Sequence, residues 1–279
     1  LRRPDLSKLK ANEIELIDYE CLTYDNGFRV IGFGHFAGIV GTHNGLLAWG
    51  NKTGKYNLKR AKDCKDFNEL KLLYDNFNPG PLKIVLTGNG RVAKGALEML
   101  DIMKIKKVDS KSFLNNNFDE AVFTQLDVME LYAKKDNTTY DVSEFFNNPS
   151  GFYSIFQPYT KVCDLMINAI YWNPKAPLFF SASETNSSDF KIKVIADISC
   201  DIKGGVPITL KATSIDNPVF GYNPINKKIT DPYQDYTIDI MSVDNLPNEL
   251  PRDASEEFSN SLINHVIDPL IKNGSNPMI

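Results

Sequence analysis

The feature that most constrains the fold is a glycine-rich turn between a short apolar run and an amphipathic segment. Residues 83–87 are nearly all apolar, and Gly88-Asn89-Gly90-Arg91-Val92-Ala93 follows them directly. Apolar residues then recur at roughly helical spacing as far as Ile102. A short apolar run bounded by turn residues is typical of a strand buried on both faces. The pattern therefore predicts a strand, a glycine turn and a helix, which together make one βα unit.

The turn fits the G-x-G-x-x-[GA] pattern of dinucleotide-binding folds. Gly88 permits the tight turn, Gly90 lets the backbone approach a pyrophosphate, and the small Ala93 lets the helix pack on the strand. The N-terminus of the helix then offers N–H groups and a positive dipole end to the phosphates. The strand before the turn and the helix after it favour dinucleotide binding over the alternative, a purely structural glycine turn.

Dinucleotide-binding folds carry an acid about 20 positions after the glycines, for the ribose hydroxyls. Asp109 lies 19 positions after Gly90. Asp127, at the end of a later apolar run, is the alternative candidate. An acid at this place favours NAD, because it repels the 2′-phosphate of NADP. Lys106 and Lys107 weaken that preference, so NADP stays the alternative cofactor. For either aspartate, the other interpretation is an ordinary loop carboxylate.

Apolar and helical patterns alternate through the rest of the chain. Further strands are expected over residues 122–128, 165–171, 193–199 and 236–243. Further helices are expected over 129–134 and 151–162, and from Asp253, which with Glu256 has capping-box spacing, to Ile271. Buried strands that alternate with helices imply a parallel sheet covered on both faces. The expected fold is therefore α/β, a Rossmann-like, parallel, doubly wound sheet.

Polar residues follow two of these expected strands. Asn168 to Tyr171 end one strand, and Asp197 to Asp201 end the next. In doubly wound sheets, the carboxyl ends of the strands border the cleft that binds ligands. These residues are therefore candidates for the site, with an ordinary polar strand terminus as the alternative.

The first eighty residues have a different pattern. Short strands are expected over Ile14–Tyr19 and Arg29–Phe33, and a helix of small apolar residues over Ala37–Trp49. Each glycine in a helix costs about 1 kcal/mol relative to alanine. Several together indicate a close approach by another backbone, a cofactor or a partner helix, with close packing alone as an equal alternative. A charged helix is expected over 66–74, and the break at Asn78–Pro81 is interpreted as a domain boundary.

Composition excludes several classes of function. The net charge is −4 and no basic stripe is present, which argues against nucleic acid and anionic membrane as partners. No apolar run approaches the roughly 20 residues of a membrane span. The four cysteines contain no C-x-x-C pair, which argues against a zinc site or a disulfide scaffold and favours a reducing compartment, the cytoplasm. No cluster of metal ligands is visible in the sequence, so no metal is expected.

Several segments together resemble one family. They are residues 26–41, 86–96, 167–171, 197–201 and 242–255. In this order they are similar to signature segments of the lysine-forming saccharopine dehydrogenases. The same pattern occurs in the lysine–ketoglutarate reductase half of bifunctional lysine-degrading enzymes, and alanine dehydrogenase is a more distant relative. The likeness runs from about Glu15 to Ile271, and its last segment, V-D-N-L-P-x-E-L-P-R-x-A-S, is long and specific.

The resemblance implies two Rossmann-like lobes with nucleotide and substrate between them. Residues 1–60 would be the C-terminal part of the substrate and catalytic lobe, a remnant of the second lobe. Residues 81–243 would be the NAD(P)-binding domain, and 244–279 a return segment with a helix that packs on the first lobe. By motif match, Arg29 would bind a substrate carboxylate and Phe33 would line its pocket.

The resemblance also implies a set of dinucleotide contacts. Gly88, Gly90, Arg91 and Val92 would hold the pyrophosphate; Ile170 and Tyr171 would border the adenosine or nicotinamide; and Asp244, Asn245 and Leu246 would lie at the nicotinamide end.

The implied reaction is hydride transfer between a nicotinamide and the secondary amine or imine that links lysine and 2-oxoglutarate. The partners would be a small amino acid and a 2-oxo acid, and the oligomeric state is not predicted. The family's catalytic lysine and histidine lie upstream of the segment that resembles residues 14–20, and no residue of this chain matches them. Because the chain opens at Leu1 without an initiator Met, we expect that Leu1 is not the natural start. The alternatives are an alanine-dehydrogenase-like enzyme and a truncated dinucleotide-binding module without catalysis.

Overall fold

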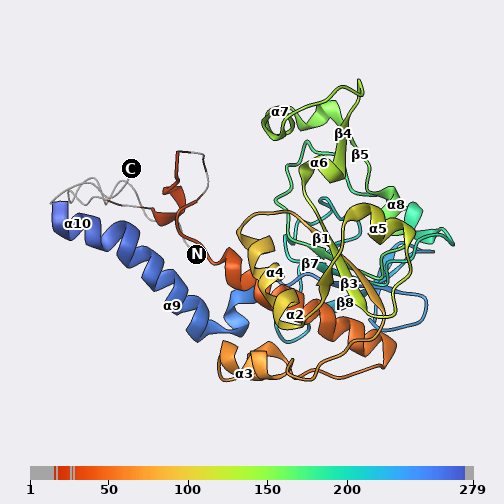
Figure 1. Cartoon of the computed structure of the whole chain (residues 1–279), viewed down its shortest axis with the longest axis horizontal. Helices are drawn as coiled ribbons and strands as arrows, with labels where there is room; N and C mark the ends of the chain where they lie inside the picture. Colours follow the sequence, from red (N-terminus) through yellow and green to blue (C-terminus); the bar gives the residue numbers. More distant parts are fainter. Residues whose placement is uncertain (1–15, 17, 26, 28, 274–279) are drawn as a thin grey trace. The chain divides into compact units, whose positions relative to one another are not determined.

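The computed structural model describes residues 16, 18–25, 27 and 29–273 (Figure 1). The chain divides into two compact units, which are described separately. The larger unit is Gly34–Ala254, and the smaller one contains the described residues up to Phe33 and from Ser255 onward. The larger unit thus begins with the small-residue helix. The lobe boundaries expected from the sequence stay a prediction.

The larger unit is built on one eight-stranded sheet with the order β2-β3-β1-β6-β7-β10-β8-β9. Its strands are β1 (Leu82–Thr87), β2 (Lys106–Lys107), β3 (Ala121–Leu126), β6 (Leu165–Asn168), β7 (Val194–Asp197), β8 (Val219–Asn223), β9 (Lys228–Thr230) and β10 (Ile238–Met241). The first six strands in this order run parallel, which confirms the expected α/β fold. Strands β8 and β9 pair antiparallel at one edge, and the sequence patterns did not predict them.

The chain order of the strands reverses beside β1. Strands β3 and β2 lie on one side of β1, and β6, β7 and β10 follow in order on the other side. In open α/β sheets, a ligand binds outside the carboxyl ends of the strands at such a reversal. The topology therefore places the expected site at the carboxyl ends of β1 and β6.

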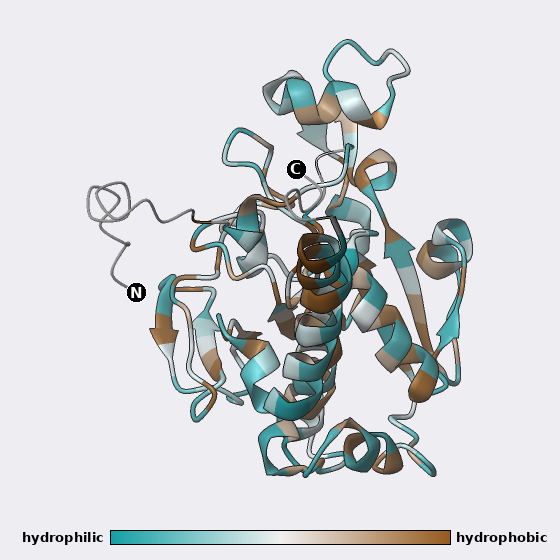
Figure 2. Cartoon of the chain, turned by 90° about the vertical axis from the view of Figure 1, so that its left-hand side faces the viewer, coloured by the Kyte–Doolittle hydropathy of each residue, from teal (hydrophilic) through white to brown (hydrophobic). Residues whose placement is uncertain are grey.

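Helices and loops cover both faces of the sheet, and each face carries its own apolar core. The helices of the larger unit are α2 (Gly34–Thr53), α3 (Phe67–Leu72), α4 (Arg91–Ile102), α5 (Ser110–Asn115), α6 (Val128–Leu131), α7 (Val142–Asn147) and α8 (Gln157–Thr160). Helices α2 and α4 lie side by side on one face of the sheet (Figure 1). Figure 2 shows hydrophobic and hydrophilic residues along the helices; α4 buries one side, whereas α2 is buried on all sides from Gly38 to Gly50.

The glycines of α2 and α4 allow these two helices to touch at backbone distance. A Cβ added at Gly38 would lie 1.9 Å from the carbonyl oxygen of Val92, and one at Gly95 would lie 2.0 Å from that of His35. The small residues of the expected helix over 37–49 therefore serve close helix packing. This contact holds α4 in place. The residues Gly88–Gly90, called the glycine loop below, lead directly into the first turn of α4.

We expect Gly95→Ala to destabilise the chain, although alanine is the better helix former by about 1 kcal/mol. The added methyl group would collide with the backbone of α2, and overpacking of this kind costs about 1–3 kcal/mol. Urea unfolding followed by circular dichroism measures the change. Lys94→Ala, one position away and exposed, is the control and should leave stability nearly unchanged. Equal or greater stability of Gly95→Ala would contradict the close contact.

The segment between β3 and β6 differs from the helices expected over 129–134 and 151–162. Helix α6 ends at Leu131, and the chain continues as β4 (Tyr132–Lys134), which pairs antiparallel with β5 (Phe152–Ser154). The helix expected over 129–134 is therefore wrong over its second half, and the helix expected over 151–162 is right only over Gln157–Thr160, which is α8. The physical reason is tertiary packing: Tyr132 and Phe152 both pack on the ring of Phe145.

The smaller unit has a short apolar core of its own, formed by Leu22, Val30, Ile31 and Val266. Its regular structure is a 3-10 turn over Tyr19–Cys21, a bridge between Thr23 and Arg29, most of α9 (Pro251–Leu262), a π-helical turn over Ile263–Ile267, and α10 (Asp268–Asn273). Of the strand expected over 14–19, positions 14, 15 and 17 lie outside the described residues; Leu16 and Asp18 are in no strand and Tyr19 opens the 3-10 turn, so the prediction is wrong at these three. The strand expected over 29–33 is only the bridge at Arg29, so that prediction is wrong over its remaining residues.

The last helix begins earlier than the capping pattern predicted. Helix α9 starts at Pro251, so Asp253 lies in its first turn and does not cap it. The Asp253 carboxylate instead accepts a hydrogen bond from the backbone N–H of Phe67 at 3.0 Å. The capping-box interpretation of Asp253 and Glu256 is therefore wrong.

Candidate functional site

The candidate site lies where the five parallel strands β3, β1, β6, β7 and β10 end. Because these strands are parallel neighbours, the residues that follow them meet at one edge of the sheet. The residues predicted to contact a dinucleotide there are Gly88, Gly90, Arg91, Val92, Asp127, Ile170, Tyr171, Asp244, Asn245 and Leu246, and each of them follows one of these strands or opens the next helix. Their roles as dinucleotide contacts stay a prediction.

Gly88 makes the tight turn that its place in the motif requires. Its φ is +93°, and a Cβ would lie 2.9 Å from the carbonyl oxygen of Ala169. Its N–H donates to the carbonyl oxygen of Leu126 at 2.7 Å. The glycine loop is thus held against the loop after β6, and any side chain at Gly88 would be strained.

Gly90 leaves room where a phosphate group would have to approach. It is the N-cap residue of α4, where no side chain makes a capping hydrogen bond. A Cβ built on Gly90 meets nothing within 4 Å. Arg91 and Val92 form the first turn of this helix, at its positive dipole end. The open space, the missing cap and the dipole together fit a pyrophosphate.

A pocket of about 520 Å³ opens beside the glycine loop and contains both candidate ribose acids. Asp127 follows β3, the strand paired directly with β1, and its Oδ2 accepts a hydrogen bond from Asn89 Nδ2 at 3.0 Å. Asp109 follows the edge strand β2, and the Ser112 hydroxyl and N–H hold the pKa of its carboxyl below the usual value. Asn89, which links the glycine loop to Asp127, is not among the residues predicted from the sequence.

A buried polar chain connects the ends of β1, β6 and β7. Thr87 donates to Asn168 at 2.7 Å, Asn168 donates to Asp197 at 2.8 Å, and Thr209 donates to the other oxygen of Asp197. Burial raises the pKa of Asp197 to about 6 against the effect of these donors. Asp197, one of the acids expected at a strand end, is therefore buried in the protein and held there by hydrogen bonds.

The other predicted contacts differ in exposure. The Tyr171 side chain is 76% exposed, Ile170 is half-buried, and Asp244 and Asn245 are exposed. Leu246 packs in the core and is 2% exposed, so a dinucleotide would reach it only through its backbone.

The two residues predicted to bind substrate belong to the smaller unit. Arg29 forms an ion pair with Glu20 at 3.9 Å, and both side chains are largely exposed. Phe33 stacks on Phe258, with the ring centroids 4.6 Å apart. Their roles in substrate binding stay predictions.

The histidines of the larger unit are both engaged. His35 Nε2 lies 2.9 Å from the carboxylate of Glu98. His43 is fully buried at 2.6 Å from the Tyr74 hydroxyl, and burial lowers its pKa to about 4. Among the described residues, no group of three or more His, Cys, Asp or Glu side chains is placed to hold a metal ion. None of the described helices has the length and apolarity that crossing a membrane requires.

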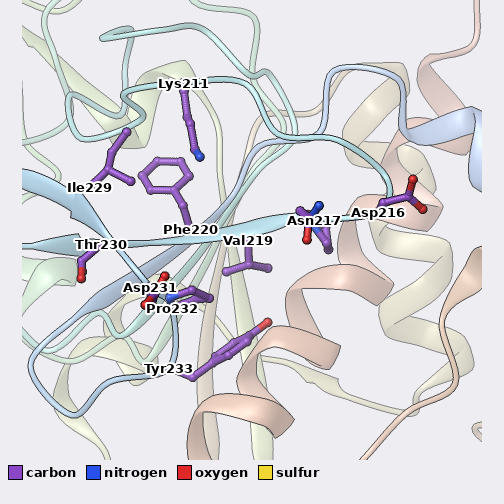
Figure 3. Close-up of a pocket in the computed structure, with 11 residues that line it drawn as sticks. Lys211, Asp216, Asn217, Val219, Phe220, Ile229, Thr230, Asp231, Pro232 and Tyr233 are labelled. Carbon is purple, nitrogen blue, oxygen red and sulfur yellow. The ribbon is translucent and has the colours of Figure 1, made fainter.

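A second cavity, of about 600 Å³, lies over the antiparallel strands β8 and β9 (Figure 3). The Lys211 ammonium lies over the Phe220 ring, 5.6 Å from its centroid, and Asp216 at the rim pairs with Lys62. No sequence motif falls on this cavity. The candidate site is therefore assigned by strand topology and the glycine loop, and not by cavity size.

Comparison with known proteins identifies homologues over most of the chain. Rat mitochondrial alpha-aminoadipic semialdehyde synthase is 28% identical over 98% of this chain and 34% of its own length. Saccharopine dehydrogenase (NAD(+), L-lysine-forming) of Schizosaccharomyces pombe is 28% identical over 94% of this chain and 64% of its own. The chain thus spans about a third to two thirds of these relatives. No family model matches it.

The fold also has a counterpart among solved structures. An L-alanine dehydrogenase superposes with a TM-score of 0.52 at 18% identity, over 92% of this chain and 59% of that protein. At this identity the similarity concerns the fold alone. It agrees with the mostly parallel sheet described above and with the resemblance found in the sequence.

Proposed function

We propose that this chain is the dinucleotide-binding part of an NAD(P)-dependent oxidoreductase that acts on the CH–NH group of an amino acid. The observation that carries the proposal is the glycine loop: a positive-φ Gly88, an open Gly90 and an uncapped helix at the point where the strand order reverses. The homologues named saccharopine dehydrogenase and alpha-aminoadipic semialdehyde synthase support the reaction class.

The nicotinamide, when bound, supplies the hydride chemistry. The task of this chain is then to bind and orient the dinucleotide. The α4 N-terminus and Gly90 would receive the pyrophosphate, and Asp127 would accept hydrogen bonds from the ribose hydroxyls. We assign no general acid or base, because no residue of this chain matches the catalytic lysine and histidine of the saccharopine dehydrogenases that it resembles.

We propose NAD as the cofactor, with Asp127 as the residue that selects it. Asp127 lies in the pocket beside the glycine loop, and its charge opposes a 2′-phosphate. We expect the chain to bind NADH at least about tenfold more tightly than NADPH, a difference of about 1.4 kcal/mol. Asp127 is also the N-cap of α6 and accepts from the N–H of Met129. Asp127→Asn keeps an oxygen for this cap and should bring the two affinities close together in fluorescence titrations.

Asp109→Asn is the matched control, because it makes the same change in the same pocket. Asp109 follows the edge strand β2, whereas Asp127 follows β3, which pairs directly with β1 and its glycine loop, so Asp109→Asn should keep the preference for NADH. A loss of preference in Asp109→Asn and not in Asp127→Asn would assign the ribose to Asp109.

We propose that the substrates are lysine and 2-oxoglutarate joined through a secondary amine, as in the saccharopine dehydrogenases. The test is an assay of NADH oxidation by the whole oxidoreductase of which this chain is the dinucleotide-binding part, with lysine plus 2-oxoglutarate compared with pyruvate plus ammonia. Turnover only with pyruvate and ammonia would favour an alanine-dehydrogenase-like enzyme, whose fold the chain shares. NADH binding without turnover by that whole protein would favour a binding module. We propose the cytoplasm as the compartment, because the four cysteines are free thiols in the structure and suit a reducing environment; the rat relative is named mitochondrial.

A further inference from the structure

The chain of hydrogen bonds that joins Thr87, Asn168 and Asp197 has a regular origin in the sheet. Each of these residues is the last one of its strand, β1, β6 or β7. The register pairs Thr87 with Asn168 and Asn168 with Asp197. The three side chains therefore stand in one row across the carboxyl edge, at the roots of the loops that carry the candidate site.

The row is buried and its hydrogen bonds have one direction. Thr87, Asn168, Asp197 and Thr209 are each at most 2% exposed. Asp197 accepts from Asn168 on one oxygen and from Thr209 on the other. A carboxylate cannot donate, so it fixes the amide of Asn168 with its carbonyl oxygen toward Thr87. Asparagine at 197 would allow this amide to be reversed.

The direction of the hydrogen bonds in this row determines how Thr87 meets the backbone of the loop after β6. Because the Thr87 hydroxyl donates to Asn168, its lone pair faces the N–H of Ala169 at 3.3 Å. The carbonyl oxygen of Ala169 in turn lies against Gly88. In the same loop, the Ile170 carbonyl oxygen accepts from the Ser199 hydroxyl at 2.6 Å.

A buried anion is a costly way to hold three strands together. No ion pair to Asp197 is found among residues 29–273. Its charge is offset by hydrogen bonds from Asn168, Thr209 and the backbone N–H of Cys200, and burial still raises the pKa of the carboxyl to about 6. Neutral side chains would hold strand ends without that cost. The cost is understandable if the fixed direction of the row is needed for function.

We propose that Asp197 is a positioning residue for dinucleotide binding, which acts through Asn168 and Thr87 to fix the glycine loop and the loop after β6. This inference rests on the proposed function. Asp197 itself does not touch the dinucleotide, because its side chain is enclosed by the protein.

The test is the isosteric variant Asp197→Asn, titrated with NADH at about pH 8, where the wild-type carboxylate is ionised. We expect the Kd to rise by about three- to tenfold, while the free energy of unfolding is unchanged or higher because a buried charge is removed. Amide hydrogen exchange in 88–90 and 169–171 should become faster. An unchanged Kd with unchanged exchange, or a fall in stability that accounts for the weaker binding, would overturn the positioning role.

Two controls separate this role from a general effect of the substitution. Asp164→Asn makes the same change just before the first residue of β6, at the opposite end of that strand, and should leave the Kd unchanged. Thr209→Ser keeps the hydroxyl that donates to Asp197 and should bind like the wild type, whereas Thr209→Val should weaken binding. If the wild-type chain does not bind NADH, the proposed function fails, and hydrogen exchange in the two loops still tests whether Asp197 positions them.

Discussion

Gly90→Val should weaken NADH binding at least about 100-fold without unfolding the chain. A Cβ at Gly90 meets no atom within 4 Å, and its φ of −76° is open to any L residue. The valine side chain would thus be accepted by the fold and would fill the space left for the pyrophosphate. A 100-fold change corresponds to about 2.7 kcal/mol, as expected when a charged group loses its backbone hydrogen bonds. Fluorescence titration with NADH measures the effect.

A graded series makes this test sharper. Gly90→Ala should lie between the wild type and valine, because the methyl group fills less of the same space. Lys94→Val introduces the same side chain one helical turn further along α4, at an exposed position, and should bind like the wild type. Unchanged affinity in Gly90→Val, with intact circular dichroism, would refute dinucleotide binding at this loop.

The parts of the fold that were predictable are those in which local sequence and tertiary context agree. The buried strand over 83–87, the glycine turn and α4 each follow from short-range pattern, and the structure places all three as expected. The charged helix expected over 66–74 is also confirmed as α3, with Asp66 as its N-cap. In these elements the local preference and the tertiary packing favour the same structure.

The parts that were not predictable depend on distant contacts. The carboxylate of Asp253 has the spacing of a cap, but it binds the N–H of Phe67, far away in the chain. The antiparallel strands β8 and β9 are short; β8 pairs with β10, which follows both of them in the chain, and β9 pairs with β8. The candidate site residues could be placed at the strand ends from the sequence. The direction of the hydrogen bonds that hold Asn168 and Asp197 could not, because it depends on side chains from three different strands.

The long motif over 242–255 shows that a specific sequence pattern can serve structure as well as binding. Glu249 within it is buried, accepts from Asn44 Nδ2 at 2.8 Å and lies 3.6 Å from Arg60. Burial raises the pKa of this carboxyl, which the amide and the guanidinium oppose. The motif thus ties the segment after β10 to α2, so its resemblance to a family carries information about the fold as much as about the ligand.

Lys52→Met should destabilise the larger unit by about 3–5 kcal/mol, because it leaves a buried carboxylate without its cation. Lys52 Nζ lies 3.3 Å from Asp239 Oδ2, and the two side chains are 5% and 0% exposed. The same ammonium donates to the hydroxyl and the carbonyl oxygen of Thr237. It therefore fastens the turn before β10 to the last turn of α2. Urea unfolding at neutral pH measures the loss.

The double variant Lys52→Met/Asp239→Asn identifies the source of that loss. Because asparagine removes the charge and keeps an oxygen for the N–H of Tyr233 and the hydroxyl of Thr237, it should recover a large part of the stability lost in Lys52→Met. Lys62→Met, which breaks the exposed pair with Asp216, is the control and should cost less than about 1 kcal/mol. If the double variant were as unstable as Lys52→Met, the loss would come from the hydrogen bonds of Lys52 to Thr237, and the stranded charge would not be its cause.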